Sequence, residues 1–186
     1  YLSNPKSPNI FIAKAVVFEG PEDYHKRLNN KKLKIDENSI LIIRGCGPVG
    51  YPGSAEVINM QPPDRLLKKG INTLPTLGDG RQSGTSASPS ILHVSPESAV
   101  GGDLGIVKTG DKIKIDLNKR RVDLLISKSE FKNRRKKRKK FKINNQTPWQ
   151  EIFRDTVGQL EDGACIKSRG IYLKVSTSKG IPRDSH

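Results

Sequence analysis

The residues best suited to chemistry in this chain lie in the segment GDGRQSGTSASPS, residues 78–90. It follows an apolar run and offers three glycines, an acid, an arginine and several hydroxyl groups. Gly78, Gly80 and Gly84 permit positive φ, so we expect successive backbone N–H groups to converge and form an anion-binding concavity. Ser83 lies inside this turn, where an alkoxide or a bound oxyanion would be stabilised. We name residues 78–90 the second glycine loop.

A glycine-rich segment also occurs upstream, RGCGPVGYPGSAE, residues 44–56, which we name the first glycine loop. Taken alone, a Gly/Ser-rich stretch is more often a flexible linker than a site. Two such loops on one short chain favour a functional site instead.

These loops carry a family resemblance. GPVGYPGSAEVINM and GDGRQSGTSASPSILHVSPESAVGGDLGIVKTGD resemble the carboxy-terminal domain of the dihydroxy-acid and sugar-acid dehydratases. The resemblance continues through IKIDLNKRRVDLLIS, QTPWQEIFRDTVGQL and the closing PRDSH, and it reaches back to VVFEGPEDYHKRL. It therefore covers nearly the whole chain.

Two positions distinguish branches within this family. Branched-chain amino-acid and gluconate-type enzymes usually carry Phe where Gln82 stands, and Ala or Gly where Thr85 stands. The form GDGRQSGTS, together with PVGYPGSAEV, resembles the arabinonate and xylonate (pentonate) dehydratases. The alternative is a dihydroxy-acid dehydratase of branched-chain amino-acid synthesis.

The resemblance implies a hydro-lyase that removes water from a 2,3-dihydroxy acid. This reaction needs a base for the C2 proton, a Lewis acid for the C3 hydroxyl and a cation beside the carboxylate. By resemblance, Ser83 is the base, acting as an alkoxide, and Glu56 is one Mg²⁺ ligand. Without the resemblance, Glu56 would more simply be an acid at a helix N-terminus. The family holds its iron–sulfur cluster, and most ligands of both cofactors, in an amino-terminal domain.

Further residues are candidates for substrate binding or support. Thr85 can hydrogen-bond the base or the substrate, or act only as a turn hydroxyl. Arg81 can bind a substrate carboxylate, although an ion pair with Asp79 that holds the loop together is favoured. Gly84 belongs to the same turn, and His186, in the closing PRDSH, can reach a neighbouring subunit's active site.

The cysteines, Cys46 and Cys165, lack the spacing of a disulfide framework or a metal site. We expect small buried residues and no cluster on this chain, so the isolated chain should be inactive. The start YLSNP lacks an initiator Met and is no signal peptide, which indicates that the chain begins within a longer protein. No apolar run approaches the ~20 residues of a membrane span, and we expect a cytoplasmic homo-oligomer that acts on a small sugar acid.

The net charge of +15 is concentrated in one segment, residues 128–142, which holds ten Lys or Arg and one Glu. Its core, residues 132–142, suggests a protein of another class, one that binds nucleic-acid phosphates without sequence preference. It has one aromatic within that core, Phe141, and no recognition motif beside it, so a solvated charged face is favoured. A non-enzymatic β-barrel interaction module would explain the strands but not GDGRQSG.

The length suits one domain, 1–186, of the α/β class and rich in strands. The resemblance implies a swivelling-type β-barrel with flanking α-helices. We expect residues 1–14 to be a loop or linker from the amino-terminal domain, 128–146 a basic helix or arm, and 147–186 a terminal helix, strand and tail.

Apolar runs between turn residues predict the strands, and Pro, Gly and acidic residues mark the helices. The expected strands are 15–19, 39–44, 71–77, 104–108, 112–117, 121–126 and 170–176, and the expected helices are 20–28, 56–60, 62–70 and 148–160. The strands 39–44 and 71–77 should lie side by side and deliver both glycine loops to one end of the barrel. Ser83 and Glu56 would then share one site.

Overall fold

One six-stranded sheet organises the computed structural model, which describes residues 9–52, 56, 59–83, 87–143 and 146–167. The strand order is β4-β3-β2-β1-β5-β6. The strands are β1 Ile10–Phe18, β2 Ser39–Ile43, β3 Thr76–Gly78, β4 Ser90–Ile91, β5 Lys112–Asp116 and β6 Arg121–Leu124. Strands β1 to β4 pair in parallel, whereas β5 and β6 are added antiparallel, as the expected hairpin.

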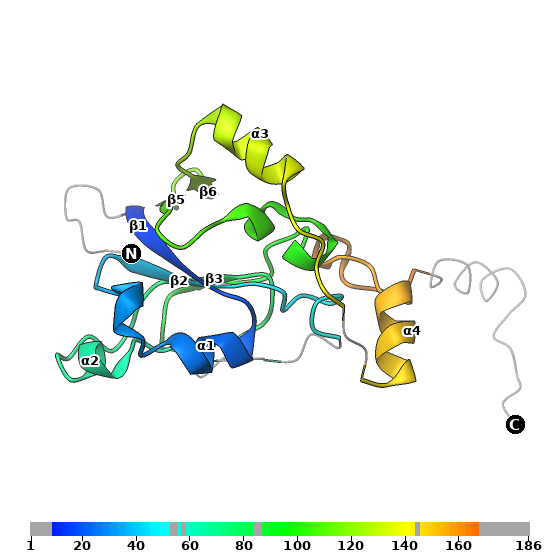
Figure 1. Cartoon of the computed structure of the whole chain (residues 1–186), viewed down its shortest axis with the longest axis horizontal. Helices are drawn as coiled ribbons and strands as arrows, with labels where there is room; N and C mark the ends of the chain where they lie inside the picture. The colour runs from blue at the N-terminus through cyan, green and yellow to red at the C-terminus, as the bar shows by residue number, and fades with distance from the viewer. Residues whose placement is uncertain (1–8, 53–55, 57–58, 84–86, 144–145, 168–186) are drawn as a thin grey trace, which may run out of the picture.

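The sheet curls into a half-barrel with helices around it (Figure 1), so the strand-rich α/β class is confirmed. Within the described residues, the outer strands β4 and β6 each pair with a single neighbour. The closed, swivelling-type barrel therefore stays a prediction.

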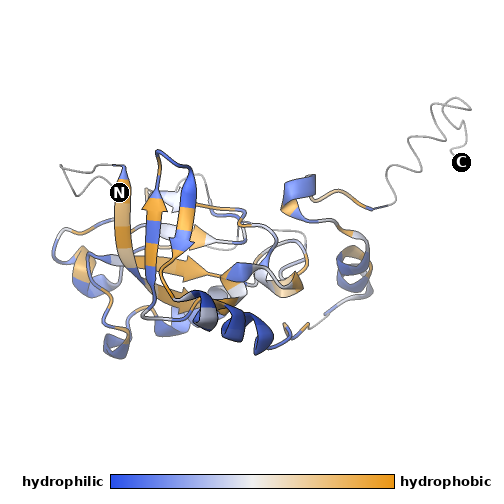
Figure 2. Cartoon of the chain, turned by 90° about the horizontal axis from the view of Figure 1, so that it is seen from above, coloured by the Kyte–Doolittle hydropathy of each residue, from blue (hydrophilic) through white to orange (hydrophobic). Residues whose placement is uncertain are grey.

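The core is divided between the two faces of the sheet. Along β1, Ala13, Ala15 and Val17 belong to one buried cluster, and Val16 and Phe18 belong to the other. This alternation has the two-residue period of a strand. All of β2 is buried, as expected for a parallel strand covered on both faces. Figure 2 shows the hydrophobic colour gathered in the strands.

The helices lie around the sheet (Figure 1). They are α1 Pro21–Arg27, α2 Asp64–Leu67, α3 Lys128–Lys136 and α4 Pro148–Thr156, with 3-10 turns η1 Lys31–Leu33, η2 Ser98–Val100, η3 Asp103–Ile106 and η4 Leu160–Asp162. Helix α1 begins at a proline with acids in its first turn, as predicted. Helix α4 begins at a Thr147 cap that accepts from the Gln150 N–H. None of the helices in the described part has the length and apolarity needed to cross a membrane.

The first strand begins earlier than predicted, which corrects the expected loop over residues 1–14. It starts at Ile10, while residues 1–8 lie outside the described part. Phe11 and Ala13 are buried there, and β1 pairs along this stretch with β5.

Other elements are shorter than predicted or differ in type. The expected strand 104–108 is the 3-10 turn η3, and the expected strand 71–77 is reduced to β3, which begins directly after Pro75. Proline has no N–H to donate to the ladder, and Pro75 contributes only its carbonyl, which accepts from the Leu41 N–H at 2.9 Å. The predicted helix 56–60 is not formed at its described residues. The predicted helices 62–70 and 148–160 shorten to α2 and α4, and the predicted strand 170–176 lies outside the described part.

The basic segment forms helix α3 followed by an arm. Arg134 of α3 forms ion pairs with Asp111 and Glu130, and Arg135 pairs with Asp103. Arg138 donates to the Gly101 carbonyl. These arginines attach the helix and arm to the body of the chain. The lysines of residues 132–142 are exposed, as expected for a solvated charged face, and nucleic-acid binding stays an untested alternative.

Candidate functional site

The two glycine loops leave neighbouring parallel strands at the same edge of the sheet. Ile43, the last residue of β2, is the register partner of Gly78, the last residue of β3. Carboxyl ends of adjacent parallel strands face one way, so the loops that follow them meet. The predicted side-by-side placement of these strands is confirmed.

The far end of the first loop is joined to the early part of the second loop by Glu56 and Arg81. These residues form an isolated parallel β-bridge. The Glu56 Oε1 atom lies 3.5 Å from an Arg81 guanidinium nitrogen, and both side chains are about half exposed. An ion pair so exposed is weak, so the Glu56 carboxylate stays open to solvent or a ligand. The predicted helical start at Glu56 is wrong because this residue pairs with the second loop instead.

Asp79 binds the first glycine loop from the second. This fully buried carboxylate accepts from the backbone N–H groups of Gly45 and Cys46, at 3.1 and 2.9 Å. It also accepts from the N–H and hydroxyl of Ser98. The favoured Asp79–Arg81 ion pair is therefore wrong: Asp79 does hold the loop, but through N–H groups, and Arg81 pairs with Glu56.

Glu97 completes the binding of the first loop. Its buried carboxylate accepts from the N–H groups of Val49 and Gly50, each at 2.8 Å. Gln159 exchanges two hydrogen bonds with it, donating to its carboxylate and accepting from its backbone N–H, both at 2.9 Å. Four N–H groups of the first loop are thus satisfied by two internal carboxylates.

Sequence reasoning missed Glu97, Ser98 and Gln159. One signal was available, because no Lys or Arg occurs between Arg81 and Lys108. An acid in such a stretch has no local cation, so a bond to backbone N–H groups is the simplest way to bury it.

The glycines of the second loop are required for close approach. Gly78 and Gly80 are not among the positive-φ residues, which corrects the expected concavity at these positions. A Cβ on Gly80 would lie 2.5 Å from the Cys46 Cβ and 2.6 Å from the Cys46 carbonyl oxygen. A Cβ on Gly78 would lie 2.8 Å from Ile43. The loops touch backbone to backbone, and a side chain would separate them.

Gln82 anchors the second loop next to the predicted base. Its buried amide donates to the Thr76 hydroxyl at 3.2 Å and accepts from the Ser90 hydroxyl at 3.3 Å. The residue that distinguishes the family branches thus points into the protein. Ser83, which follows it, is half-buried. Gly84, Thr85 and His186 lie outside the described residues.

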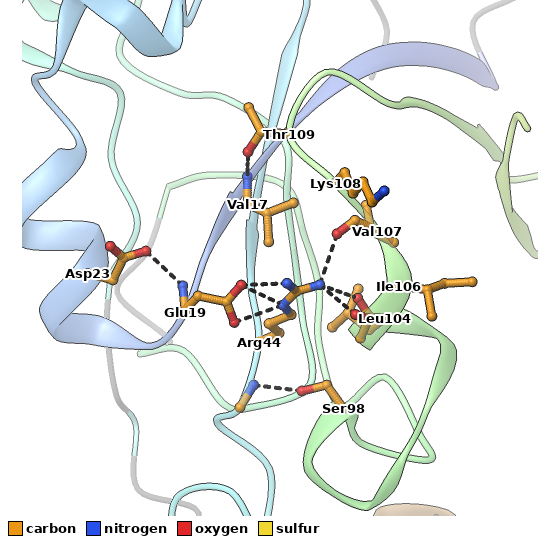
Figure 3. A network of polar contacts seen from close by, with 12 residues as sticks. Val17, Glu19, Asp23, Arg44, Ser98, Leu104, Ile106, Val107, Lys108 and Thr109 are labelled. Atoms are coloured by element: carbon orange, nitrogen blue, oxygen red, sulfur yellow. Dashed lines mark hydrogen bonds and ion pairs between the residues drawn. The ribbon is translucent and has the colours of Figure 1, made fainter. Parts of the chain in front are cut away.

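Arg44 fixes the start of the first loop (Figure 3). Its Nε lies 3.0 and 2.9 Å from the two Glu19 carboxylate oxygens. One terminal nitrogen donates to the carbonyl oxygens of Leu104, Gly105 and Val107. These carbonyls belong to η3 and the residue after it, which explains why this segment is not a strand.

The cysteines do not fit an iron–sulfur site. Cys46 is a buried residue of the first loop, and burial, followed by the charge of Asp79, raises the pKa of its thiol. A cluster needs thiolates, which this position disfavours. Cys165 is half-buried on the segment after α4. In the described part of the chain no three His, Cys, Asp or Glu side chains are grouped as a metal site.

Comparison of the sequence with known proteins shows the family to which the chain belongs. The family described as dihydroxy-acid/6-phosphogluconate dehydratase, C-terminal, matches residues 3–164. The chain belongs to this family. The dehydratase domain is 52% identical to a D-xylonate dehydratase of Caulobacter vibrioides over 186 residues, all of this chain and 31% of the relative. It is 40% identical to an L-arabinonate dehydratase of Rhizobium leguminosarum over 97% of this chain and 31% of the relative.

A third relative represents the alternative branch. A mitochondrial dihydroxy-acid dehydratase of Aspergillus fumigatus is 39% identical over 127 residues, 68% of this chain and 21% of the relative. The two pentonate enzymes match over more of the dehydratase domain, which agrees with the branch expected from Gln82 and Thr85. The domain spans about a third of the length of the two pentonate relatives.

Proposed function

We propose that this chain is the C-terminal part of a hydro-lyase that converts a pentonate, such as L-arabinonate or D-xylonate, to a 2-keto-3-deoxy acid. The observation that carries the proposal is the bridge between Glu56 and Arg81. Arg81 lies two positions before Ser83 in the second loop. The bridge joins the loop bearing the proposed metal ligand to the loop bearing the proposed base. Since the domain spans 31% of its relatives, we assign the activity to the longer protein.

Ser83 is the proposed base. A serine hydroxyl is a weak acid, so its surroundings must favour the alkoxide. The N–H groups of Gly45, Cys46, Val49 and Gly50 already bind carboxylates. These four N–H groups are therefore not available to Ser83, and its own loop or a bound cation is the proposed source of the stabilising charge.

Glu56 fits the role of a magnesium ligand. Mg²⁺ prefers oxygen ligands and is commonly held by one or two carboxylates together with the substrate. The half-exposed Glu56 carboxylate can offer one oxygen while Arg81 lies on its other side. Bound there, the ion would supply positive charge beside the substrate carboxylate. Arg81, also half exposed, can bind that carboxylate directly.

The reaction balances as a β-elimination. Ser83 takes the proton from C2, and the electron pair left behind forms the C2–C3 double bond as the C3–O bond breaks. The departing hydroxyl leaves as water by taking up one proton, which Ser83 can return. The enol product becomes the 2-keto acid when its hydroxyl loses a proton and C3 gains one. We assign the iron–sulfur group that assists the departing hydroxyl to the amino-terminal domain, since neither Cys46 nor Cys165 fits such a cluster.

Assays of the full-length enzyme test this proposal. We expect turnover of D-xylonate or L-arabinonate and little of 2,3-dihydroxyisovalerate. Turnover of dihydroxyisovalerate without any pentonate would instead support the dihydroxy-acid branch. The isolated chain should be inactive and should show no iron–sulfur absorbance after reconstitution with iron and sulfide.

A further inference from the structure

We propose that Asp79 and Glu97 are positioning residues, whose carboxylates set the shape of the first glycine loop and so place Glu56 against the second loop. This inference rests on the proposed function only where it refers to the metal and to turnover. The attachment of the loop is a separate statement about folding.

Asp79 fixes the position of the first loop relative to the second. It follows Gly78 directly, where the β2–β3 pairing ends, and it lies four residues before Ser83. Through the N–H groups of Gly45 and Cys46, it binds the first loop just after β2. Beyond the strands, Asp79 thus holds the start of the first loop, and Arg81, two positions later in the second loop, pairs with Glu56 at the far end of the first loop.

Glu97 fixes the middle of the first loop from a third segment. It binds the N–H groups of Val49 and Gly50, and Gln159 holds the carboxylate in place. The Arg154 side chain of α4 donates to the Val49 carbonyl at 2.8 Å. Val49 is therefore held through both its N–H and its carbonyl group.

The charge state of these side chains matters because each carboxylate oxygen serves as an acceptor. In Asp79, one oxygen accepts from Cys46 and the other from Gly45 and Ser98. An asparagine has the same shape but replaces one acceptor with an NH₂ donor, which would face a backbone N–H. A buried donor facing a donor loses the bond and gains a desolvation cost.

The test uses the full-length enzyme with Asp79→Asn and Glu97→Gln. A matched control is Asp116→Asn, since Asp116 is a buried carboxylate on β5 that accepts from the Lys119 N–H at 3.0 Å, away from the glycine loops. A further variant, Ser98→Ala, removes one donor to Asp79 and one acceptor of the Gly45 N–H, and it leaves both carboxylates intact. It keeps the test interpretable if a carboxamide variant fails to fold.

Hydrogen exchange of peptides from the first loop is the readout that needs no activity. We expect Asp79→Asn to speed exchange at residue 46, and Glu97→Gln at residues 49–50, by about ten-fold or more. The effect of Asp79→Asn at residue 45 should be smaller, because the Gly45 N–H also donates to the Ser98 hydroxyl. Ser98→Ala should speed exchange at residue 45, whose N–H loses an acceptor, and leave residue 46 protected by Asp79. Asp116→Asn should produce no change in this loop. Unchanged exchange in the Asp79 and Glu97 variants would overturn the proposal.

The second readout is the Mg²⁺ concentration that gives half-maximal turnover. We expect both carboxamide variants to raise it by about ten-fold relative to the Asp116→Asn control. If hydrogen exchange in the first loop is faster but the Mg²⁺ concentration for half-maximal turnover is unchanged, Asp79 and Glu97 stabilise the loop without positioning Glu56. That result would refute the proposal. If the wild-type enzyme neither dehydrates a sugar acid nor responds to Mg²⁺, the proposed function fails, and loop exchange alone decides the present inference.

Discussion

Arg81 lies directly across from Glu56 as its parallel bridge partner, so the carboxylate proposed to bind a cation already has a cation beside it. The separation of 3.5 Å and the half exposure of both side chains make this a weak pair. A divalent ion can therefore compete with Arg81 or bind on the other side of the carboxylate. This relationship leads to opposite expectations for the two residues.

We expect Glu56→Gln to raise the Mg²⁺ concentration for half-maximal turnover, with activity partly recovered in excess metal, because the amide keeps one oxygen but loses the charge. Arg81→Gln should lower that concentration by about two- to five-fold, since it removes a nearby positive charge worth ~0–1 kcal/mol. The Michaelis constant of Arg81→Gln for the sugar acid should rise, because the proposed contact with the substrate carboxylate is lost. Magnesium titrations of turnover in both variants provide the measurement, and equal shifts in one direction would contradict this account.

Ser83→Ala in the full-length enzyme should abolish nearly all turnover while iron, sulfide and Mg²⁺ contents stay at wild-type levels. The substitution removes only the proposed base. Steady-state assays combined with metal analysis test this expectation. Substantial residual turnover would transfer the role of base to another residue.

Gly80→Ala should destabilise the domain by about 1–3 kcal/mol or more, since its new methyl group would overlap the Cys46 carbonyl oxygen at 2.6 Å. Gly105→Ala is a suitable control, because a Cβ there meets its nearest atom at 3.4 Å, an ordinary contact distance. Thermal unfolding of the two variants should differ clearly. Equal melting temperatures would show that the loops can separate without cost.

Cys46 should make stability fall at alkaline pH. Burial and the charge of Asp79 raise the pKa of its thiol in the folded state, so the thiol ionises only in the unfolded chain above the ordinary pKa of ~8.5. The unfolded state then binds fewer protons, and the free energy of unfolding falls by about 1.4 kcal/mol per pH unit from this group.

The measurement compares urea unfolding of the wild type with Cys46→Ala between pH 7 and 10. In Cys46→Ala, the free energy of unfolding should fall less steeply with pH, because the contribution of this thiol is lost. Cys165→Ala, at a half-buried position, should keep the pH dependence of the wild type. Identical slopes for the wild type and Cys46→Ala would contradict a persistently protonated thiol.

The sequence predicts those parts of the fold that depend on local pattern. The β5–β6 hairpin, helix α1 and the pairing of β2 with β3 follow from apolar runs, turn residues and a first-turn proline. The errors occur where contacts distant in sequence decide the structure. The segment after Gly102 is a 3-10 turn whose carbonyls bind Arg44, about sixty positions away.

The candidate site was predictable in its position but not in its internal bonding. The glycine loops indicate a close meeting, and the strand order allows it. Glycine alone does not reveal whether positive φ or close approach is required, and at Gly78 and Gly80 close approach is the reason. The partners of Asp79 could not be read from the sequence, because they are backbone groups 33 and 34 positions away.

The burial of Asp79 and Glu97 gives this basic chain a locally negative interior. The charges of Asp79, Glu22 and Glu97 all raise the pKa of the Cys46 thiol, although the net charge of the chain is +15. Exposed lysines attract an anionic substrate over a distance that shrinks as salt is added, whereas buried carboxylates are screened much less. At high ionic strength, the attraction for sugar acids should weaken while the preference for a cation near the first glycine loop persists.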